Sequence, residues 1–285
     1  MAEILSLESV SYSYPLPGEG EAAALREVSF EVEPGEVFCV AGPNGSGKST
    51  LAQVCAGLLS PTGGSLLYGG EKVEGRSRLR ALRKKVGLLF QSAEDQLFAD
   101  TVEKDIAFGP RCRGVRGPEL DQSVRGAAEL AGLDLEAFGG RSPFALSEGE
   151  RRRAALAGVL ALSPDVLVLD EPFIGLDYEG RTHLAAALTG YRRDRGASII
   201  VVTHELAGVW PLADRFAVMD SGSLLRVARR EDLAGAGDEL GALGMQLPDW
   251  AVLARELAAL GAPPVNPSDP DALADAAGSV MGGRR

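Results

Sequence analysis

The chain carries the sequence VFCVAGPNGSGKS at residues 37–49. Its first part, Val37–Val40, is continuously apolar, as in strands that are buried on both faces of a sheet. Its second part matches the phosphate-loop pattern G-x-x-x-x-G-K-[ST], which ends here with Lys48 and Ser49. Such a loop binds a nucleotide phosphate when it follows a strand and opens a helix. That context favours a phosphate site over a plain glycine-rich turn.

Each residue type in this loop has a chemical role. The glycines allow backbone N–H groups to close around the β-phosphate, and the following helix adds its positive N-terminus. Lys48 is expected to reach the β- and γ-phosphates, while the hydroxyl of Ser49 would ligate Mg²⁺. The residues predicted to line the nucleotide here are Gly42, Pro43, Asn44, Gly45, Ser46, Gly47, Lys48, Ser49 and Thr50.

The surrounding pattern predicts an α/β fold. Apolar strands alternate with helices, which is typical of a mostly parallel sheet. The expected strands are Glu27–Val32, Val37–Val40, Ser65–Tyr68, Val86–Phe90, Val166–Leu169 and Ser198–Val202, and the expected helices of the core are Ser49–Leu59 and Gly180–Tyr191. The stretch Thr101–Leu146 has a helical pattern with Gly and Pro punctuation, including Gly109-Pro110, and predicts an inserted helical subdomain. After Arg230 the chain is rich in Ala, Gly and Pro, with two short helices expected.

The composition of the chain limits the functions that it can have. The 285 residues carry a net charge of −11, so the field of the whole protein repels nucleic acid and anionic lipid headgroups. A local basic run, Arg76–Lys85, is interpreted as a solvated helix face in preference to a phosphate-binding patch. The three cysteines, Cys39, Cys55 and Cys112, are too scattered for a disulfide framework or a zinc site. The sequence has neither a signal peptide nor an apolar run of membrane-spanning length, so any membrane role is expected to act through a partner.

A pair of carboxylates ends a second apolar strand, in the sequence LVLDE at residues 167–171. Carboxylates at the tip of a buried strand are costly unless they serve a ligand site. Asp170 suits the shell of a magnesium ion, and Glu171 suits the base that polarises the attacking water. The alternative is that the two acids simply cap the next turn.

Residues 146–150, LSEGE, form a capping box between Ser147 and Glu150 at the start of a helix. This segment lies shortly before the Asp170–Glu171 strand, and the order of motifs resembles that of the ATPase subunits of ABC transporters. The Leu-Ser-Gly-Gly-Gln signature of that family is matched at Leu146, Ser147 and Gly149, whereas Glu148 replaces a glycine and Glu150 the glutamine. The resemblance implies that Ser147 and Gly149 contact the γ-phosphate of ATP held by the opposite subunit of a head-to-tail dimer.

The resemblance assigns four further residues. Tyr14 resembles the aromatic that stacks on adenine, with packing in the core as the alternative and Tyr12 as the substitute. Gln91 resembles the glutamine that contacts Mg²⁺ and senses the membrane partner, and Asp177 matches the D-loop. His204, at the tip of the last buried strand, matches the switch histidine that contacts the γ-phosphate. His183 has no comparable context and is expected to be exposed.

Residues 90–98 and 101–110 are similar to the energy-coupling-factor (ECF) and cobalt/nickel importer branch of the family. The tail Leu247–Leu260 resembles the C-terminal extension of that branch. Its apolar stripe, comprising Trp250, Leu253, Leu257 and Leu260, either packs on its own domain or forms a dimer contact. Ser268–Ala277 is predicted to be a second, serine-capped helix.

Together these features predict a P-loop NTPase of RecA-like ABC type with an inserted helical subdomain and a small helical extension. The ATPase domain is expected at residues 1–230, with its core at about 1–91 and 146–230 and its helical subdomain at about 92–145. The extension is expected at residues 231–285.

The resemblance implies an ATPase, with ATP and Mg²⁺ as cofactors, that energises an importer of a vitamin or metal ion. The implied partners are a transmembrane coupling protein, a substrate-binding membrane protein and a second ATPase subunit, identical or related, with no nucleic acid. The implied location is the cytoplasmic face of the membrane.

The alternatives are another class of ABC transporter, or a soluble ABC-type ATPase of DNA repair, chromosome organisation or translation. The latter is disfavoured because the chain lacks long coiled-coil insertions, tandem halves and a basic surface. A GTP switch is disfavoured because no Asn-Lys-x-Asp motif occurs.

Overall fold

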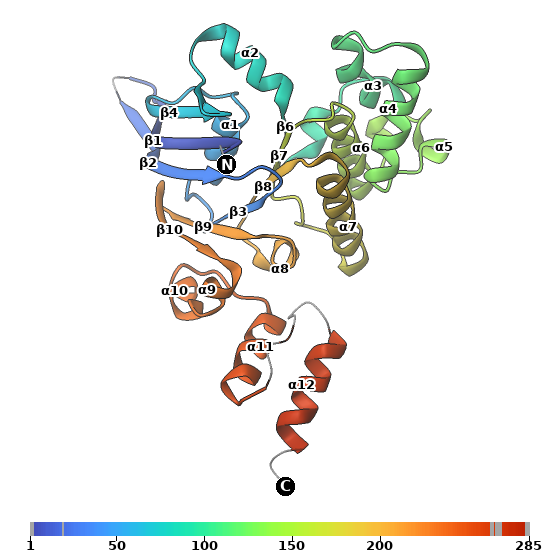
Figure 1. Cartoon of the computed structure of the whole chain (residues 1–285). Helices are drawn as coiled ribbons and strands as arrows, with labels where there is room; N and C mark the ends of the chain where they lie inside the picture. Colours follow the sequence, from blue (N-terminus) through green and yellow to red (C-terminus); the bar gives the residue numbers. More distant parts are fainter. Residues whose placement is uncertain (1–2, 19, 263–264, 266–269, 283–285) are drawn as a thin grey trace.

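The computed structural model describes residues 3–282 except for residue 19, residues 263–264 and residues 266–269. Figure 1 shows two sheets side by side, a group of helices beside them and the C-terminal helices extending from one end of the molecule. Among the described residues, no helix combines the length and the apolar character needed to cross a bilayer.

The first sheet is antiparallel and has the order β2-β1-β4-β5. Its strands are β1 (Leu5–Pro15), β2 (Glu21–Val32), β4 (Gly63–Tyr68) and β5 (Glu71–Lys72). The strand predicted at Glu27 therefore begins earlier, at Glu21, because β2 pairs along the length of β1.

The second sheet has the order β10-β9-β3-β8-β7-β6 and forms the centre of the molecule. Its strands are β3 (Val37–Ala41), β6 (Val86–Leu89), β7 (Val166–Asp170), β8 (Ser198–Thr203), β9 (Arg215–Asp220) and β10 (Ser223–Arg229). All neighbours in this sheet are parallel except β9 and β10. The mostly parallel α/β sheet predicted from the sequence is confirmed.

The continuous apolar runs result from burial of this sheet on both faces. In β3, Phe38 and Val40 join one hydrophobic cluster, while Val37 and Cys39 join the other on the opposite face. Strands β7 and β8 divide their side chains between the same two clusters. Because successive side chains of a strand point to opposite faces, both faces of such a strand must be mainly apolar. The polar residues of β7 and β8, Asp170, Ser198 and Thr203, stand at strand ends.

Helices cover the sheet and form the side group. The helices of the core are α1 (Lys48–Cys55), α2 (Gly75–Lys85), α7 (Tyr178–Arg195) and α8 (Leu206–Val209). The side group comprises α3 (Val102–Cys112), α4 (Gly117–Leu130), α5 (Leu135–Phe138) and α6 (Glu148–Leu160), with short 3₁₀ turns at Ala93–Gln96 and Pro143–Ala145.

Several predicted features of the helices were wrong. Helix α7 runs from Tyr178 to Arg195 rather than from Gly180 to Tyr191, because Asp177 caps its start and the left-handed Gly196 ends it. Helix α1 ends at Cys55 rather than at Leu59, because Gly57 adopts a left-handed conformation with φ of 67°. Pro110 does not interrupt the helical pattern but lies in the last turn of α3.

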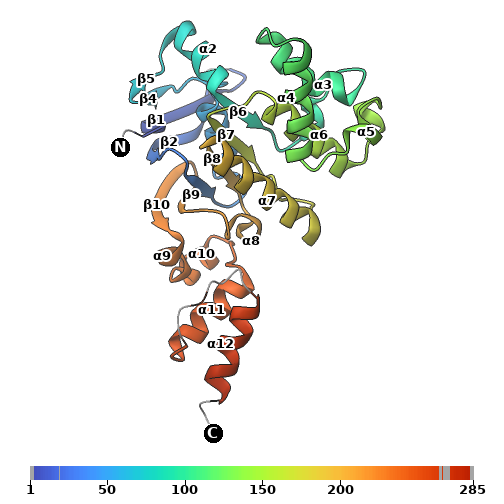
Figure 2. The ribbon, with the colours of Figure 1, turned by 45° about the vertical axis from the view of Figure 1, so that its right-hand side comes forward.

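In the described part of the C-terminal region there are four helices rather than the two predicted: α9 (Arg230–Ala234), α10 (Gly237–Ala242), α11 (Asp249–Ala259) and α12 (Pro270–Gly282). The predicted serine cap at Ser268 lies outside the described residues. Figure 2 shows α11 and α12 packed side by side, away from the sheets. In the predicted stripe, Leu257 is buried and Trp250 half-buried, whereas Leu253 and Leu260 are 45% and 54% exposed. Only part of the stripe is therefore covered within the chain.

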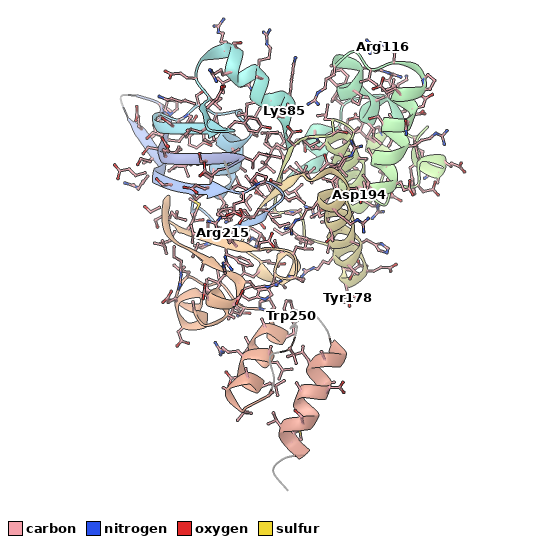
Figure 3. All side chains as sticks on the ribbon, viewed as in Figure 1. Lys85, Arg116, Tyr178, Asp194, Arg215 and Trp250 are labelled. Atoms are coloured by element: carbon pink, nitrogen blue, oxygen red, sulfur yellow. The ribbon has the colours of Figure 1, made fainter. Side chains whose placement is uncertain are left out.

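The tail packs in two separate ways. Leu240, Met245 and Leu247 are buried in the main hydrophobic cluster, together with residues of β9 and α8. By contrast, α11 and α12 meet through a small cluster of their own, which comprises Leu257, Ala262, Leu273 and Ala276. Trp250 lies at the junction of these two parts (Figure 3).

We predict that two truncations differ in stability. A chain ending at Gly261 should keep nearly the wild-type free energy of unfolding, because it loses only the partner of a small cluster. A chain ending at Gly235 loses three large buried side chains, each worth about 1.5–3 kcal/mol. After a discount of about a third for the apolar surface that the unfolded chain already buries, it should be less stable by roughly 3–6 kcal/mol. Urea unfolding of both chains measures this difference. Equal losses of stability would show that the first part of the tail does not belong to the core.

Candidate functional site

The parallel strands bring the sequence-predicted residues to one edge of the central sheet. Ala41 of β3 pairs with Thr203 of β8, and Asp170 of β7 pairs with Val202. The loops that follow β3, β7 and β8 therefore leave the sheet side by side at its carboxyl edge, which is where ligands bind in open α/β sheets.

The phosphate loop folds around a buried lysine. The Nζ atom of Lys48 donates hydrogen bonds to the carbonyl oxygens of Gly42 at 2.8 Å and Pro43 at 2.9 Å. Burial lowers the pKa of Lys48, and this effect is opposed by the charges of Glu171 and Asp170. The lysine is thus held in the loop by two carbonyl groups, which a phosphate could replace.

Glycine is required at two positions of this loop. A Cβ on Gly42 would lie 2.4 Å from the carbonyl oxygen of Met219, and one on Gly47 would lie 2.4 Å from that of Ala24. Gly47 also has φ of 96° and stands at the N-cap of α1, where no side chain caps the helix. The structure therefore shows no side-chain cap from the described residues at the start of α1, as in helix N-termini that bind anions.

Asp170 is buried beside the loop. One of its carboxylate oxygens, Oδ1, has no hydrogen-bond partner among the described residues. Burial raises the pKa of Asp170, the nearby charge of Glu171 adds to this rise, and a hydrogen bond from Ser49 opposes it. A buried carboxylate oxygen without a partner is costly in an isolated protein, so its chemistry fits a cation ligand.

Glu171 is the most tightly held carboxylate of the site and is 4% exposed. Its Oε2 accepts a hydrogen bond from the hydroxyl of Thr203 at 2.6 Å, and its Oε1 accepts one from the backbone N–H of His204 at 2.9 Å. The Nδ1 atom of the His204 ring lies 2.8 Å from the same Oε1. The backbone of Glu171 is in the left-handed region with φ of 50°, a conformation that non-glycine residues adopt at a cost. Several contacts therefore fix the direction of this side chain.

Thr203 was not singled out from the sequence. The sequence indicates its role only by position, since Thr203 is the polar residue that follows the apolar run Ile199–Val202 of β8 and directly precedes His204. Its hydroxyl also accepts the backbone N–H of Glu205 at 3.0 Å, which orients it toward Glu171. Thr203 is a positioning residue for the carboxylate.

Tyr14 lies next to the phosphate loop. Its hydroxyl is 3.2 Å from the hydroxyl of Thr50 on α1, and the side chain is 38% exposed. Its ring makes an edge contact with Tyr12, with centroids 4.9 Å apart. This placement near the nucleotide loop fits the predicted adenine contact, which stays a prediction.

The signature segment lies on another part of the subunit. Ser147 caps α6, and the predicted capping box with Glu150 is present. The hydroxyl and the backbone N–H of Ser147 both donate to Oε2 of Glu150 at 2.7 Å, and these hydrogen bonds hold the pKa of Glu150 below its usual range. Helix α6 stands in the side group of helices, whereas α1 lies against the sheets (Figure 1). Ser147 and Gly149 are therefore not brought to the phosphate loop of the same subunit.

Gln91 and Asp177 occupy the remaining loops. Gln91 is exposed two residues after the end of β6. Asp177 caps α7, since its Oδ1 accepts the backbone N–H of Gly180 at 2.8 Å. His183, on α7, is exposed as expected.

Arg152 links these loops and was also missed from the sequence. Its guanidinium donates to the carbonyl oxygen of Ile174, and its Nη2 lies 3.5 Å from the carbonyl oxygen of Gln91. A single side chain of the signature helix therefore touches both the Gln91 loop and the loop before Asp177. Contacts between segments so distant in sequence have no local pattern that could predict them.

Comparison with known proteins identifies relatives over most of the chain. The family model described as "ABC transporter" matches residues 25–174. The energy-coupling factor transporter ATP-binding protein EcfA2 of Clostridium perfringens is 39% identical over 254 residues, which is 89% of each chain. EcfA2 of Bacillus cereus is 40% identical over 247 residues, covering 86% of this chain and 84% of the relative.

Two solved structures are similar to this one. The first is cbiO1 from Clostridium perfringens, part of the ABC transporter complex cbiONQ, with a TM-score of 0.74, 30% identity and coverage of 90% of this chain and 100% of the other. The second is the dimeric ATP-binding cassette MJ0796 in a post-hydrolysis state bound to ADP and Pi. It has a TM-score of 0.72, 26% identity and coverage of 79% of this chain and 98% of the other. Both likenesses confirm the predicted P-loop fold of ABC type.

We predict that Thr203→Val slows ATP turnover by about 5- to 100-fold without weakening ATP binding, because Oε2 of Glu171 loses a buried donor. Glu171→Gln should slow turnover by several orders of magnitude if Glu171 is the base predicted from the sequence, since the amide cannot accept the proton. Steady-state ATPase rates and nucleotide titrations measure the two effects separately. Thr189→Val is the matched control, because that hydroxyl is exposed on α7 and bonds only within its helix. A wild-type turnover rate in Thr203→Val would remove Thr203 from the positioning of the base.

A further prediction concerns Glu148, whose side chain is exposed and whose Oε1 lies 3.9 Å from the place of a Cβ on Gly175. A carboxylate turned toward a phosphate would cost on the order of 1–3 kcal/mol. Because the side chain faces the Gly175 turn and solvent, we expect Glu148→Gly to change ATPase activity by less than about twofold, or 0.4 kcal/mol. A rise of tenfold or more in the assembled complex would instead mean that the carboxylate faces the nucleotide and restrains the site.

Proposed function

Because the chain belongs to the family of ABC transporter ATP-binding subunits, we propose that it powers a membrane importer of the ECF or cobalt/nickel type for a micronutrient. It is an ATPase of this family, and its relatives named EcfA2 are matched along nearly their whole length. The observation that carries the mechanism is the carboxylate of Glu171, fixed by Thr203 and His204 at the edge that also bears the phosphate loop.

The proposed cycle begins with exchange of hydrogen-bond partners in the phosphate loop. When the β- and γ-phosphates enter, Lys48 leaves the carbonyl oxygens of Gly42 and Pro43 and pairs with phosphate oxygens. The free N–H groups at the start of α1 bind the same phosphates. ATP binding therefore replaces internal contacts of the loop by stronger, charge-assisted ones.

Glu171 then acts on the attacking water. Its carboxylate is oriented by the hydroxyl of Thr203 and the N–H of His204, so it points in one direction and can accept the proton of the water. His204 contacts Glu171 through Nδ1, which leaves its Nε2 atom to meet the γ-phosphate. Fixing both groups before the reaction lowers the reorganisation that the chemical step requires.

Magnesium fits the residues beside the loop. The unpartnered Oδ1 of Asp170 and the hydroxyl of Ser49, which bonds to the same carboxylate, are oxygen donors of the kind that Mg²⁺ prefers. The described residues contain no cluster of three or more acidic, histidine or cysteine ligands, so most of the ion's shell would come from phosphate and water. The ion would neutralise charge on the transferred phosphate. Gln91 would join the shell from its loop.

A second ATPase subunit would complete the site. Ser147 and Gly149 lie on the side group of helices and not at the phosphate loop of their own subunit. A head-to-tail pair, identical or related, would bring the signature of one subunit to the nucleotide of the other. Asp177 would lie in the loop between the two sites, and Tyr14 would stack on the adenine.

The membrane partners are proposed to be a transmembrane coupling protein and a substrate-binding membrane protein. The coupling protein would dock near Gln91 and the helical subdomain of about residues 92–145, where Arg152 connects the Gln91 loop to the signature helix. The subunit would then be peripheral, on the cytoplasmic face of the membrane. We propose limits of 1–230 for the ATPase domain and 231–285 for the extension, with the tail up to Ala251 packed on the core.

The test uses tagged wild-type chain and Lys48→Ala, purified from solubilised membranes of the source cells. We expect wild type to bind ATP and to co-purify with integral membrane proteins. Lys48→Ala should bind ATP about 10- to 100-fold more weakly, because the phosphates lose a charged partner, while keeping the membrane proteins.

Lys72→Ala serves as the control, because Lys72 is exposed and remote from the loop in sequence. Unchanged ATP affinity in Lys48→Ala would contradict the placement of the nucleotide. Recovery of ribosomes or nucleic acid with wild type, in place of membrane proteins, would contradict the transport function.

A further inference from the structure

Positive charge is concentrated in two short segments of an otherwise acidic chain. Residues 71–85 and 111–116 together carry ten basic and two acidic side chains. The rest of the chain carries nineteen basic and thirty-eight acidic side chains. The net charge of −11 therefore conceals a strongly basic part and an even more acidic remainder.

The first segment contains helix α2, which exposes nearly its whole surface. Leu82 is its buried residue, while its arginine and lysine side chains are exposed. Among the described residues, Arg76, Arg80 and Lys84 have no ion pair or hydrogen-bond partner, so their charges face solvent unopposed.

The acidic side chains beside this helix are already neutralised. Glu71 pairs with Arg78, Glu74 lies 3.4 Å from Lys72, and Asp165 lies 2.9 Å from Lys85. Asp165 also accepts a hydrogen bond from Tyr68. The unopposed charges that remain on this surface are consequently positive.

The second segment is the turn between α3 and α4. Arg113 donates to the carbonyl oxygen of Leu162, and Arg116 donates to that of Arg111. Neutral backbone groups hold these two arginines, and the nearby charge of Asp165 also acts on Arg113. A hollow lined by Lys84, Lys85, Cys112, Arg113, Ser163 and Asp165 joins this turn to the end of α2. We define the basic face as Arg76, Arg80, Lys84, Arg111, Arg113 and Arg116.

The basic face lies at the end of the molecule opposite the C-terminal helices. Figures 1 and 2 both show α2 and the α3–α4 turn at one end and α11 and α12 at the other. Figure 3 shows Lys85 at the foot of α2 and Arg116 at the tip of the side group. Strand β6 follows α2 directly and leads to Gln91, the proposed edge for the coupling protein. The face therefore adjoins the surface that would meet the membrane protein.

We propose that the basic face contacts the anionic lipid headgroups of the membrane that holds the transport partner. This inference rests on the proposed membrane role and adds a second, lipid contact to it. Long basic side chains spread over two exposed elements match a diffuse negative surface, to which polybasic segments are attracted. An acidic peptide would instead be expected to bind in a narrow groove whose basic side chains are held in fixed positions.

The overall negative charge does not prevent this contact. At physiological salt, charges are screened beyond about 8 Å, so a membrane responds to the nearest face rather than to the whole protein. The sequence-based expectation that anionic lipid is repelled applies to the field of the whole protein. The structure shows that the basic face carries a local positive charge that this average does not describe.

The test is flotation of the full-length chain with phosphatidylcholine vesicles and with vesicles containing about 30% phosphatidylglycerol, an anionic lipid. We expect binding to the anionic vesicles alone, and its loss when salt is raised to about 0.5 M. The triple variant Arg76→Gln, Arg80→Gln, Lys84→Gln should bind at least about tenfold more weakly. The control variant Arg125→Gln, Arg195→Gln, Arg229→Gln removes the same charge from exposed positions outside the face and should bind like wild type.

Three results would overturn the proposal. The first is equal binding to neutral and anionic vesicles, and the second is an equal loss of vesicle binding in both triple variants. The third is unchanged vesicle binding combined with loss of the membrane partner from the basic-face variant in detergent, which would assign the face to an acidic segment of that partner. Failure of the lipid proposal can be distinguished from failure of the proposed transport function. Vesicle flotation tests the lipid contact without any membrane protein, and co-purification tests the transport partner without anionic lipid.

Discussion

The parallel pairing of β3, β8 and β7 is the constraint on which the site depends. Because these strands run in one direction and in register, the phosphate loop, the Asp170–Glu171 pair and His204 all leave the sheet at the same edge. Helices must then return each strand to the opposite edge, which buries both faces of the sheet and demands continuous apolar strands. The parallel hydrogen bonding of these strands thus determines both the apolar core and the position of the site.

The free subunit holds opposite charges in a partly buried arrangement. Lys48 is satisfied by carbonyl oxygens, and Asp170 keeps an unpartnered oxygen in a place where burial raises its pKa. Groups of this kind are individually expensive to desolvate. Nucleotide binding would relieve this situation and should raise the stability of the core, as any ligand that binds the folded state does.

The fold and most of the candidate site residues could be predicted from sequence because they depend on local patterns. Apolar runs such as Val37–Val40 and the fixed spacing of the phosphate loop identify a strand, a loop and a helix without any knowledge of distant contacts. The end of α1 at Gly57, by contrast, follows from a left-handed glycine that a helical pattern does not reveal. Thr203 and Arg152 act on residues far away in the chain, so their roles appear only once the sheet and α6 have been placed.

The capping box at Ser147 also sets a competition for one proton. A serine hydroxyl has a single hydrogen to donate, and in the free subunit Ser147 donates it to Glu150. In the proposed dimer, a γ-phosphate oxygen would have to accept the hydroxyl hydrogen in place of Oε2 of Glu150, which lies 2.7 Å from the serine oxygen. ADP lacks the oxygen that could compete, so the resting bond would be restored as soon as the γ-phosphate departs. The hydrogen bond that caps helix α6 would in this way favour separation of the subunits after hydrolysis.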